Sequence, residues 1–352
     1  MTLVVARIVD QQISIVADTL ITNLERPLPL AQGMVKSCML PSGICVSYAG
    51  SPDLASKDIW RFSKLFPQNA DFLETIKFFE QSSRLTGNEY IVAFAKNPKI
   101  VKITNGKRQI GSSKTLWIGD KNAYEIFRAC ESKLRPKTER NRAISAVLVA
   151  DEPLGSPASD LYSIMRHVIK DSEIKSVGGF VSIVSNLGGN FRHPCMSDML
   201  FDWPANEPPE FELNLNDRIA FGSSGENEEY SVSIFTTAYS NFTFIGFYFL
   251  SGRVAFVFHP TRTLMADSCT VIREVSPTEL PTKLTEIFGR DYGWLVWIAG
   301  PSPDKKSSER YFDLDSDAGN QFGFIMHCNT LPKPEEKRTL PDLDIFFPGP
   351  ES

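Results

Sequence analysis

The chain has 352 residues, of which 42% are hydrophobic and 22% charged, and its formal net charge is -5 at pH 7. This composition is ordinary for a folded protein and the length allows two domains. The negative charge argues against nucleic acid or a membrane as a partner, and no apolar run approaches the roughly 20 residues of a transmembrane helix. Six scattered cysteines and a start without a basic region favour a cytoplasmic protein with reduced thiols.

The first residues predict a β-hairpin that begins at the chain terminus. Leu3–Val9 and Ile13–Thr22 have the composition of buried strands, and the three polar residues between them have that of a turn. If all three belong to the turn, Asp18 lies opposite Val4, diagonal to Thr2 and on the same face of the hairpin.

Beyond this hairpin, blocks of strands alternate with helices. Turn residues and apolar patterning predict strands over 34–40, 43–50, 89–106 (a hairpin), 114–119 and 178–186. Helical spacing of apolar residues predicts helices over 51–66, 71–84, 121–134, 159–170 and 278–289, the first with Ser51 as its N-cap. Helix pairs between blocks of mostly antiparallel strands predict an α+β protein with helices outside and sheets inside.

A proline- and acid-rich segment at 203–214 is the expected domain boundary. It separates a first domain over residues 1–205 from a β-rich region over 214–330 that contains an aromatic hairpin at 242–260. An isolated hairpin is marginally stable in water, so this one must join a larger sheet, the first domain or another subunit. Residues 331–352 form a Pro-rich tail without a core of its own.

Thr2 combines a nucleophile and a base once the initiator methionine is removed, which the small side chain at position 2 permits. Its free α-amine would have a pKa of about 7.7–8 and be partly neutral at cellular pH. A threonine hydroxyl is a weak nucleophile until a base takes its proton, and the terminal amine can be that base. Taken alone, a threonine at position 2 is far more often an ordinary processed start, since Met-Thr openings are common.

Two lone charges lie in apolar segments that we expect near this residue. Asp18 is the one charge in ISIVADTLI, and Lys36 is the one charge in MVKSCML. A buried carboxylate needs a partner, and a lysine near the nucleophile would lower the proton affinity of the site. The same two residues can also be read as a structural ion pair.

Together these residues resemble the proteasome β-type N-terminal nucleophile (Ntn) hydrolases. Among bacterial members, the Ser-Val-Gly sequence at 176–178 is most similar to the ancestral (Anbu-like) branch. The resemblance rests on the threonine, the ADT and YAG motifs, Lys36 and the segment EIKSVGGFVSIV, and it covers about residues 2–200. It implies a four-layer αββα sandwich, with a C-terminal β-rich region added. Within it, Thr2 would be the nucleophile and Asp18 and Lys36 its electrostatic partners.

The same resemblance assigns further residues and meets two departures. It implies the Gly50 amide as the oxyanion donor and Glu173 and Ser176 as supports for the amine. The family's serine at a GSG turn is Asp120 here, and its aspartate before the serine is Glu173. Both changes fall in the proton-shuttling half of the site. Gly50 can also be a plain glycine between a strand and a helix.

No cofactor or metal site is expected from the remaining motifs. His193 with Cys195, and His327 with Cys328, lack the ligand spacing of a zinc finger. The segments GSS at 111–113 and GSSG at 222–225 lack the spacing of a nucleophile elbow and have the composition of turns.

These observations favour an N-terminal threonine peptidase or amide hydrolase that acts on a peptide or protein substrate within a self-assembled homo-oligomer. One alternative is a proteasome-like scaffold without activity that uses its C-terminal β-rich region for assembly or partner recognition. Another is a non-peptide amidase on the same fold. No motif indicates whether an unfoldase or another regulatory partner serves the site. A methionine retained on the native protein would block the amine and exclude the hydrolase.

The tail is predicted to contact another chain. Ile345, Phe346 and Phe347 lie between prolines and acids, a pattern typical of docking peptides rather than of core strands. We therefore expect the tail to insert into a neighbouring subunit or partner and to help hold an oligomer together. Removal of residues 341–352 should shift the assembly to a smaller mass in light scattering with the fold intact. A truncated chain that keeps the full oligomeric mass would contradict this role.

Overall fold

The computed structural model describes most of the first two hundred residues and separate stretches of the remainder. The described residues are 2–23, 26–27, 33–40, 43–66, 70–111, 115–134, 145–149, 157–171, 173–186, 189–191, 193, 196–200, 212–213, 221–222, 232–238, 245–249, 254–258, 269–276, 279–288, 293–300 and 323–328. The Pro-rich tail at 331–352 and its predicted docking residues lie outside them.

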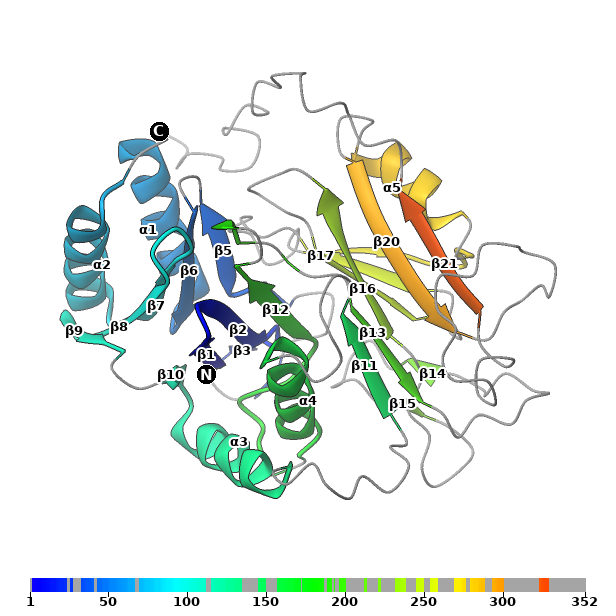
Figure 1. The fold of residues 1–352 in the computed structure, drawn as a ribbon, viewed down its shortest axis with the longest axis horizontal. Helices are drawn as coiled ribbons and strands as arrows, with labels where there is room; N and C mark the ends of the chain where they lie inside the picture. The colour runs from blue at the N-terminus through cyan, green and yellow to red at the C-terminus, as the bar shows by residue number, and fades with distance from the viewer. Residues whose placement is uncertain are drawn as a thin grey trace.

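The described stretches form helices and antiparallel strands (Figure 1). The strands up to residue 200 are β1 (Leu3–Val9), β2 (Gln12–Asp18), β3 (Thr22–Asn23), β4 (Arg26–Pro27), β5 (Ser37–Leu40), β6 (Ile44–Ala49), β7 (Glu89–Phe94), β8 (Lys99–Thr104), β9 (Lys107–Ile110), β10 (Thr115–Gly119), β11 (Ser145–Val149), β12 (Val181–Ser185) and β13 (Met196–Leu200). Beyond them lie β14 (Glu212–Leu213), β15 (Phe221–Gly222), β16 (Val232–Ala238), β17 (Ile245–Phe249), β18 (Val254–Phe258), β19 (Cys269–Ile272), β20 (Gly293–Gly300) and β21 (Gly323–Cys328). The helices are α1 (Pro52–Leu65), α2 (Phe72–Thr86), α3 (Lys121–Leu134), α4 (Pro157–Lys170) and α5 (Leu280–Phe288).

In the part of the chain that the structure describes, the first hairpin forms the middle of a four-stranded sheet with the order β10-β1-β2-β12. Its turn has two residues rather than three, and both of them, Asp10 and Gln11, have positive φ angles. Such turns normally have Gly as their second residue, and here that residue is Gln11, so nothing in the sequence indicates a two-residue turn. The predicted three-residue turn, and with it the predicted register, is wrong by one residue. Val4 faces Ala17 and not Asp18. The second strand also ends at Asp18, earlier than expected.

A second sheet, with the order β5-β6-β7-β8-β9, packs against the helices α1 and α2. The Ser51 side chain caps α1 as predicted, and α2 begins with a capping box made by Asp71 and Glu74. Gly87, with a φ of 75°, ends α2. The buried residues between these helices and the sheet include Ala55, Ile59, Phe62, Ile76, Phe79, Tyr90, Val92 and Val101.

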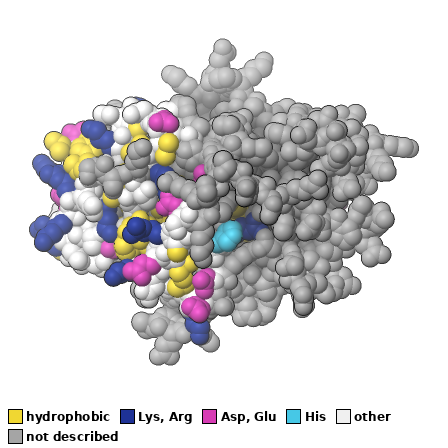
Figure 2. Space-filling model, turned by 60° about the horizontal axis from the view of Figure 1, so that its bottom comes forward, with side chains coloured by type: hydrophobic (Ala, Val, Ile, Leu, Met, Phe, Trp, Pro, Cys, Tyr) yellow, Lys and Arg dark blue, Asp and Glu magenta, His cyan; other side chains and the backbone are white. Residues whose placement is uncertain are grey.

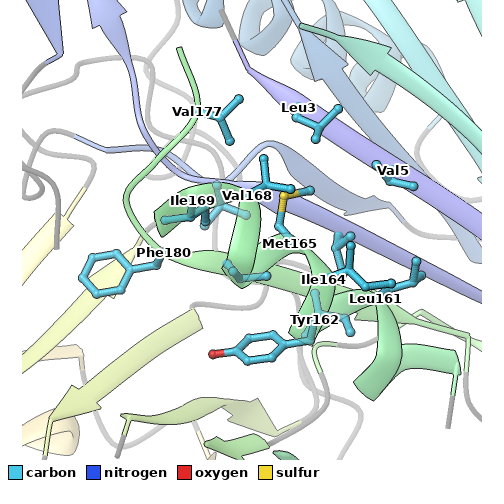
Figure 3. Packing of buried hydrophobic residues seen from close by; sticks show 14 of the residues in the cluster. Leu3, Val5, Leu161, Tyr162, Ile164, Met165, Val168, Ile169, Val177 and Phe180 are labelled. Carbon is cyan, nitrogen blue, oxygen red and sulfur yellow. The ribbon is translucent and has the colours of Figure 1, made fainter. Parts of the chain in front are cut away.

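The first sheet is covered on both faces. On one face, Val4, Ala6 and Ile15 share a buried cluster with residues of the second sheet, including Cys45, Ile91 and Ala93. On the other face, Leu3 and Val5 point toward α4 (Figure 3). The helix contributes Leu161, Ile164, Met165 and Val168 to that cluster. This alternation along β1 explains why nearly every residue of the strand is apolar.

Among the described residues, the third sheet has eight strands and takes them from both sides of residue 205. β11 and β13 pair in the same sheet as β16 to β21. The aromatic hairpin at 242–260 corresponds to β17 and β18, which lie between β16 and β19 as members of this larger sheet. This sheet thus contains strands from before and after the expected boundary at 203–214. The division of the chain into domains stays a prediction.

Phe180 links the third sheet to the first. Its ring stacks on Phe247 with the centroids 4.5 Å apart, and its centroid lies 5.1 Å from that of Phe256 and 5.5 Å from that of Phe258. Figure 3 shows the ring pointing away from α4. Since Phe180 directly precedes β12, the C-terminal sheet packs against the segment that borders β2.

The surface of the described part carries both signs of charge. In Figure 2, Lys and Arg side chains lie interspersed with Asp and Glu, and small groups of apolar side chains lie between them. Among the described helices, none is long and apolar enough to cross a membrane.

Replacing Phe180 by Ala should lower the free energy of unfolding by about 3–5 kcal/mol, because loss of a buried aromatic ring leaves a cavity between two packed sheets. Phe180 is 3% exposed. Denaturant unfolding measures the change, and Phe180→Leu, which keeps most of the volume, should cost less. A Phe180→Ala chain with wild-type stability would show that this ring does not hold the sheets together.

Candidate active site

Asp18 lies at the end of the first hairpin and has no exposed surface. Its carboxylate accepts hydrogen bonds from Leu3 N–H at 3.1 Å and Gly178 N–H at 3.3 Å, and the Thr2 hydroxyl donates to the same group. In the observed register Asp18 follows the last pair of the hairpin. From there its carboxylate reaches both of the first two residues after Met1, so the expected proximity of Thr2 and Asp18 is present despite the different register.

Lys36 neutralises this buried carboxylate. Its Nζ atom lies 2.9 Å from Asp18 Oδ1 and donates to Leu20 O at 2.6 Å. Lys36 is 3% exposed, and burial lowers its pKa while the attraction of Asp18 opposes that change. A buried ion pair is retained only where hydrogen bonds complete it, and here backbone groups do so on both partners. The structure thus brings Thr2, Asp18 and Lys36 together.

Thr2 is also held through its backbone. The Asp120 N–H donates to Thr2 O at 2.7 Å. The preceding residue, Gly119, has a φ of +97°, and a Cβ built there would lie 2.0 Å from Thr2 O. Any side chain at position 119 would therefore push β10 and the N-terminal residue apart.

Asp120 and Ser176 form a second polar pair beside Thr2. The Ser176 hydroxyl donates to Asp120 Oδ2 at 2.6 Å, while Asp120 Oδ1 accepts from Ala123 N–H at 3.0 Å in the first turn of α3. Asp120 is 7% exposed. The residue that departs from the family pattern is therefore buried, hydrogen-bonded to the predicted serine and joined to Thr2 through the backbone.

Glu173 is not brought into this group. Its side chain is exposed, and its backbone N–H donates to Asp171 Oδ1 at 2.9 Å. Among the described residues, the hydroxyl of Ser176 meets the carboxylate of Asp120 and not that of Glu173.

Gly50 follows β6 at the edge of the same region. Its φ is +124°, and a Cβ built there would lie 2.2 Å from Asn88 Oδ1. The preceding residue, Ala49, would lie 3.4 Å from the same hypothetical Cβ on Gly119 that meets Thr2. Ala49, the neighbour of Gly50, therefore lies close to Gly119, and Gly119 in turn contacts the Thr2 backbone.

Two further residues, which the sequence did not indicate as part of the site, contact the segments around Gly50 and Gly119, one residue each. Asn88 hydrogen-bonds to Ser51, next to Gly50, and Glu89 accepts from Gly119 N–H at 2.7 Å. A polar pair at the start of a strand is ordinary in a sequence, and nothing in the chain near these residues signals their long-range partners.

No metal site appears among the described residues, where no group of three or more His, Cys, Asp or Glu side chains could hold an ion. His193 Nδ1 lies 2.6 Å from Ile183 O, and burial lowers the pKa of His193 to about 4. Cys195 lies outside the described residues, while His327 and Cys328 are described as part of β21.

Replacing Lys36 by Met should lower the free energy of unfolding by about 3–5 kcal/mol, because the change removes one charge and leaves Asp18 buried without its counter-charge. The matched control is Lys121→Met, since Lys121 pairs with Glu125 at 3.7 Å but is 77% exposed. That change should cost about 1 kcal/mol or less. Denaturant unfolding compares the two, and equal small losses would show that Lys36 is not a buried partner of Asp18.

Comparison with known proteins gives structural similarity alone. No family model and no curated protein matches the chain. Anbu from Hyphomicrobium sp. strain MC1, as a Gly-1 mutant, has a TM-score of 0.40 and 12% identity over 55% of this chain and 86% of its own. Anbu (ancestral beta-subunit) from Yersinia bercovieri has a TM-score of 0.40 and 11% identity over 58% and 89%. HslV from Trypanosoma brucei has a TM-score of 0.36 and 13% identity over 52% and 98%. The chain is similar to these proteasome-like proteins, and at such scores the likeness assigns no role to any residue.

Proposed function

We propose that the protein is an N-terminal threonine hydrolase of amide bonds, with a peptide or protein as substrate. The observation that carries this proposal is the hydrogen bond from the Thr2 hydroxyl to Asp18, a buried carboxylate neutralised by Lys36. A hydroxyl beside the chain terminus, bound to a buried ion pair, is a suitable nucleophile once the terminal amine is free.

We propose the four-layer αββα sandwich as the fold around this site. Its inner layers would be the sheets that contain β1 and β6, and its outer layers would be the pairs α1–α2 and α3–α4. The packing of α1 and α2 on the second sheet, and of α4 on the first, supports this order. In the same proposal, residues 1–205 form the catalytic domain, 214–330 the C-terminal β-rich region and 331–352 a tail.

The reaction would begin after removal of Met1. The α-amine of Thr2 accepts the proton of Oγ1 as this oxygen bonds to the carbonyl carbon of the substrate. The carbonyl oxygen takes up the π electrons, and the Gly50 N–H stabilises the resulting oxyanion. As the carbonyl re-forms, the C–N bond breaks and the α-ammonium gives its proton to the leaving amine. Water, deprotonated by the same amine, then attacks the ester carbonyl. The C–Oγ1 bond breaks to release the acid, and the α-ammonium returns its proton to Oγ1.

The surrounding residues would divide into two supports. On the hydroxyl side, Asp18 orients Oγ1 and the positive charge of Lys36 lowers the proton affinity of that oxygen. On the amine side, the family resemblance implies a carboxylate at Glu173 and a hydroxyl at Ser176. Here the Ser176 hydroxyl is hydrogen-bonded to Asp120, which would take the place of Glu173. We therefore assign the amine-side carboxylate to Asp120 in this chain.

We further propose that the protein acts in the cytoplasm as a homo-oligomer, in which the tail contacts a neighbouring subunit. The buried position of Thr2, which is 4% exposed, agrees with a site that opens to substrate only after processing of the terminus.

A proteasome-like scaffold without activity is the second candidate, and the exposed side chain of Glu173 favours it. If Asp120 cannot replace that carboxylate, the amine lacks support and the fold serves assembly through its C-terminal sheet. N-terminal sequencing of the native protein distinguishes the two functions, because a retained Met1 excludes the hydrolase.

Thr2→Ala should fold normally and abolish hydrolysis of peptide reporters, whereas Thr2→Ser should keep measurable turnover because a hydroxyl remains. Wild-type turnover should rise with pH through about 7.7–8, as the terminal amine becomes neutral and can accept a proton. Intact mass after reaction with an electrophile directed at N-terminal threonine should show one adduct on the wild type and none on Thr2→Ala. Equal turnover of Thr2→Ala and wild type would refute the assignment.

A further inference from the structure

Asn88 and Glu89 lie at the junction between α2 and β7, where the chain is fixed on both sides. Gly87 ends the helix in the left-handed region, and the Asn88 N–H donates to Thr86 Oγ1 at 3.2 Å. Glu89 is the first residue of β7 and pairs with Ala49 on β6. These two adjacent side chains therefore start from a rigid base beside the end of β6.

Asn88 clamps the backbone just after Gly50. Its Oδ1 accepts from Ser51 N–H at 2.7 Å and its Nδ2 donates to Ser51 O at 3.3 Å, so one side chain binds both backbone polar groups of one residue. Asn88 is 1% exposed. The Cα of Gly50 packs against the same amide, since a Cβ there would meet Asn88 Oδ1 at 2.2 Å. The amide thus fixes the chain at the proposed oxyanion donor.

Glu89 holds the opposite side of the site. Its Oε2 accepts from Gly119 N–H at 2.7 Å, and its Oε1 accepts from Thr104 Oγ1 at 3.1 Å. Gly119 belongs to the first sheet and Glu89 to the second, so this hydrogen bond joins the two sheets. Gly119 also packs closely against the carbonyl of Thr2. The carboxylate therefore fixes the strand against which the nucleophile rests.

We propose that Asn88 and Glu89 are positioning residues that set the distance between the Thr2 hydroxyl and the Gly50 amide. Asn88 would act through Ser51 and Glu89 through Gly119, and because the two are consecutive, the backbone between them joins both halves of the site. This inference rests on the proposed hydrolase function.

We call Asn88 and Glu89 together the bridge. Loss of either bridge side chain should destabilise the transition state of the reaction. A displaced oxyanion donor lowers kcat, since the charge on the oxygen develops only as the tetrahedral intermediate forms. Substrate binding would change little. A role confined to stability would instead lower the fraction of folded chain and leave kcat per active site unchanged.

The test compares Asn88→Ala and Glu89→Ala with two exposed controls, Asn97→Ala in the β7–β8 turn and Glu125→Ala on α3. The full chain with its processed terminus is used, and active sites are counted by labelling of Thr2. For each bridge variant we expect kcat per labelled site to fall roughly tenfold to a hundredfold, with KM changed less than about twofold. The controls should keep the wild-type values.

Two further measurements separate positioning from stability. The inhibition constant of a peptide aldehyde, which forms a tetrahedral adduct with Thr2, should rise by the same factor as kcat/KM falls. Glu89→Gln keeps an acceptor for Gly119 N–H and should recover most of the kcat that Glu89→Ala loses.

Each outcome decides the inference. Wild-type kcat per labelled site in both bridge variants, or lower kcat with unchanged aldehyde affinity, would overturn it while the hydrolase function stands. A wild-type chain with a free Thr2 that neither turns over reporters nor takes the label would overturn the function itself, and the inference with it.

Discussion

The arrangement around Thr2 depends on one buried ion pair. Asp18 has no exposed surface, yet its carboxylate meets the cation of Lys36, two backbone amides and one hydroxyl. Loss of any charged partner would leave the other uncompensated in the interior, which is a strong constraint on how these segments meet. Chain ends are usually poorly ordered, but the Leu3 amide and the Thr2 hydroxyl bind this carboxylate only while the terminus stays in place. The pair therefore orders the N-terminus as well as the hydroxyl.

Close approach of backbone supplies the second constraint. At Gly119 and Gly50, an added Cβ would come within 2.0 Å of Thr2 O and 2.2 Å of Asn88 Oδ1 respectively, and both residues have positive φ. Gly179, with a φ of +73°, also packs closely, since an added Cβ would lie 2.5 Å from the Thr19 hydroxyl oxygen. Glycine is needed at such positions because no side chain fits, so the site is built from backbone surfaces that side-chain networks then hold in place.

The sequence predicts these parts unevenly, and the reasons are physical. Local patterns predict the hairpin, the Ser51 cap and all five described helices well, because capping and helical spacing act over a few residues. Two isolated charges in apolar stretches are enough to predict the pairing of Asp18 with Lys36. The register fails because a turn with positive φ at Asp10 and Gln11 has no sequence signature here. β9 was missed because all four of its residues are exposed and it has no apolar alternation. Ser51, which the Asn88 side chain binds, lies 37 residues away, and no periodicity in the sequence indicates that contact.

The carboxylates of Asp18 and Asp120, two residues that hydrogen-bond to Thr2, differ in how their charge is balanced. Asp18 meets a lysine at 2.9 Å, whereas Asp120 has no ion pair with any described side chain and is satisfied by a hydroxyl and an amide. A neutralised carboxylate can orient a hydroxyl without repelling a developing negative charge on it. An unpaired carboxylate favours a nearby positive charge, and the α-ammonium that forms during proton transfer would supply one. A serine at position 120 would be neutral, so Asp120 provides a carboxylate that a hydroxyl side chain could not supply. Among the described residues, the exposed side chain of Glu173 takes no part in the hydrogen bond between Ser176 and Asp120.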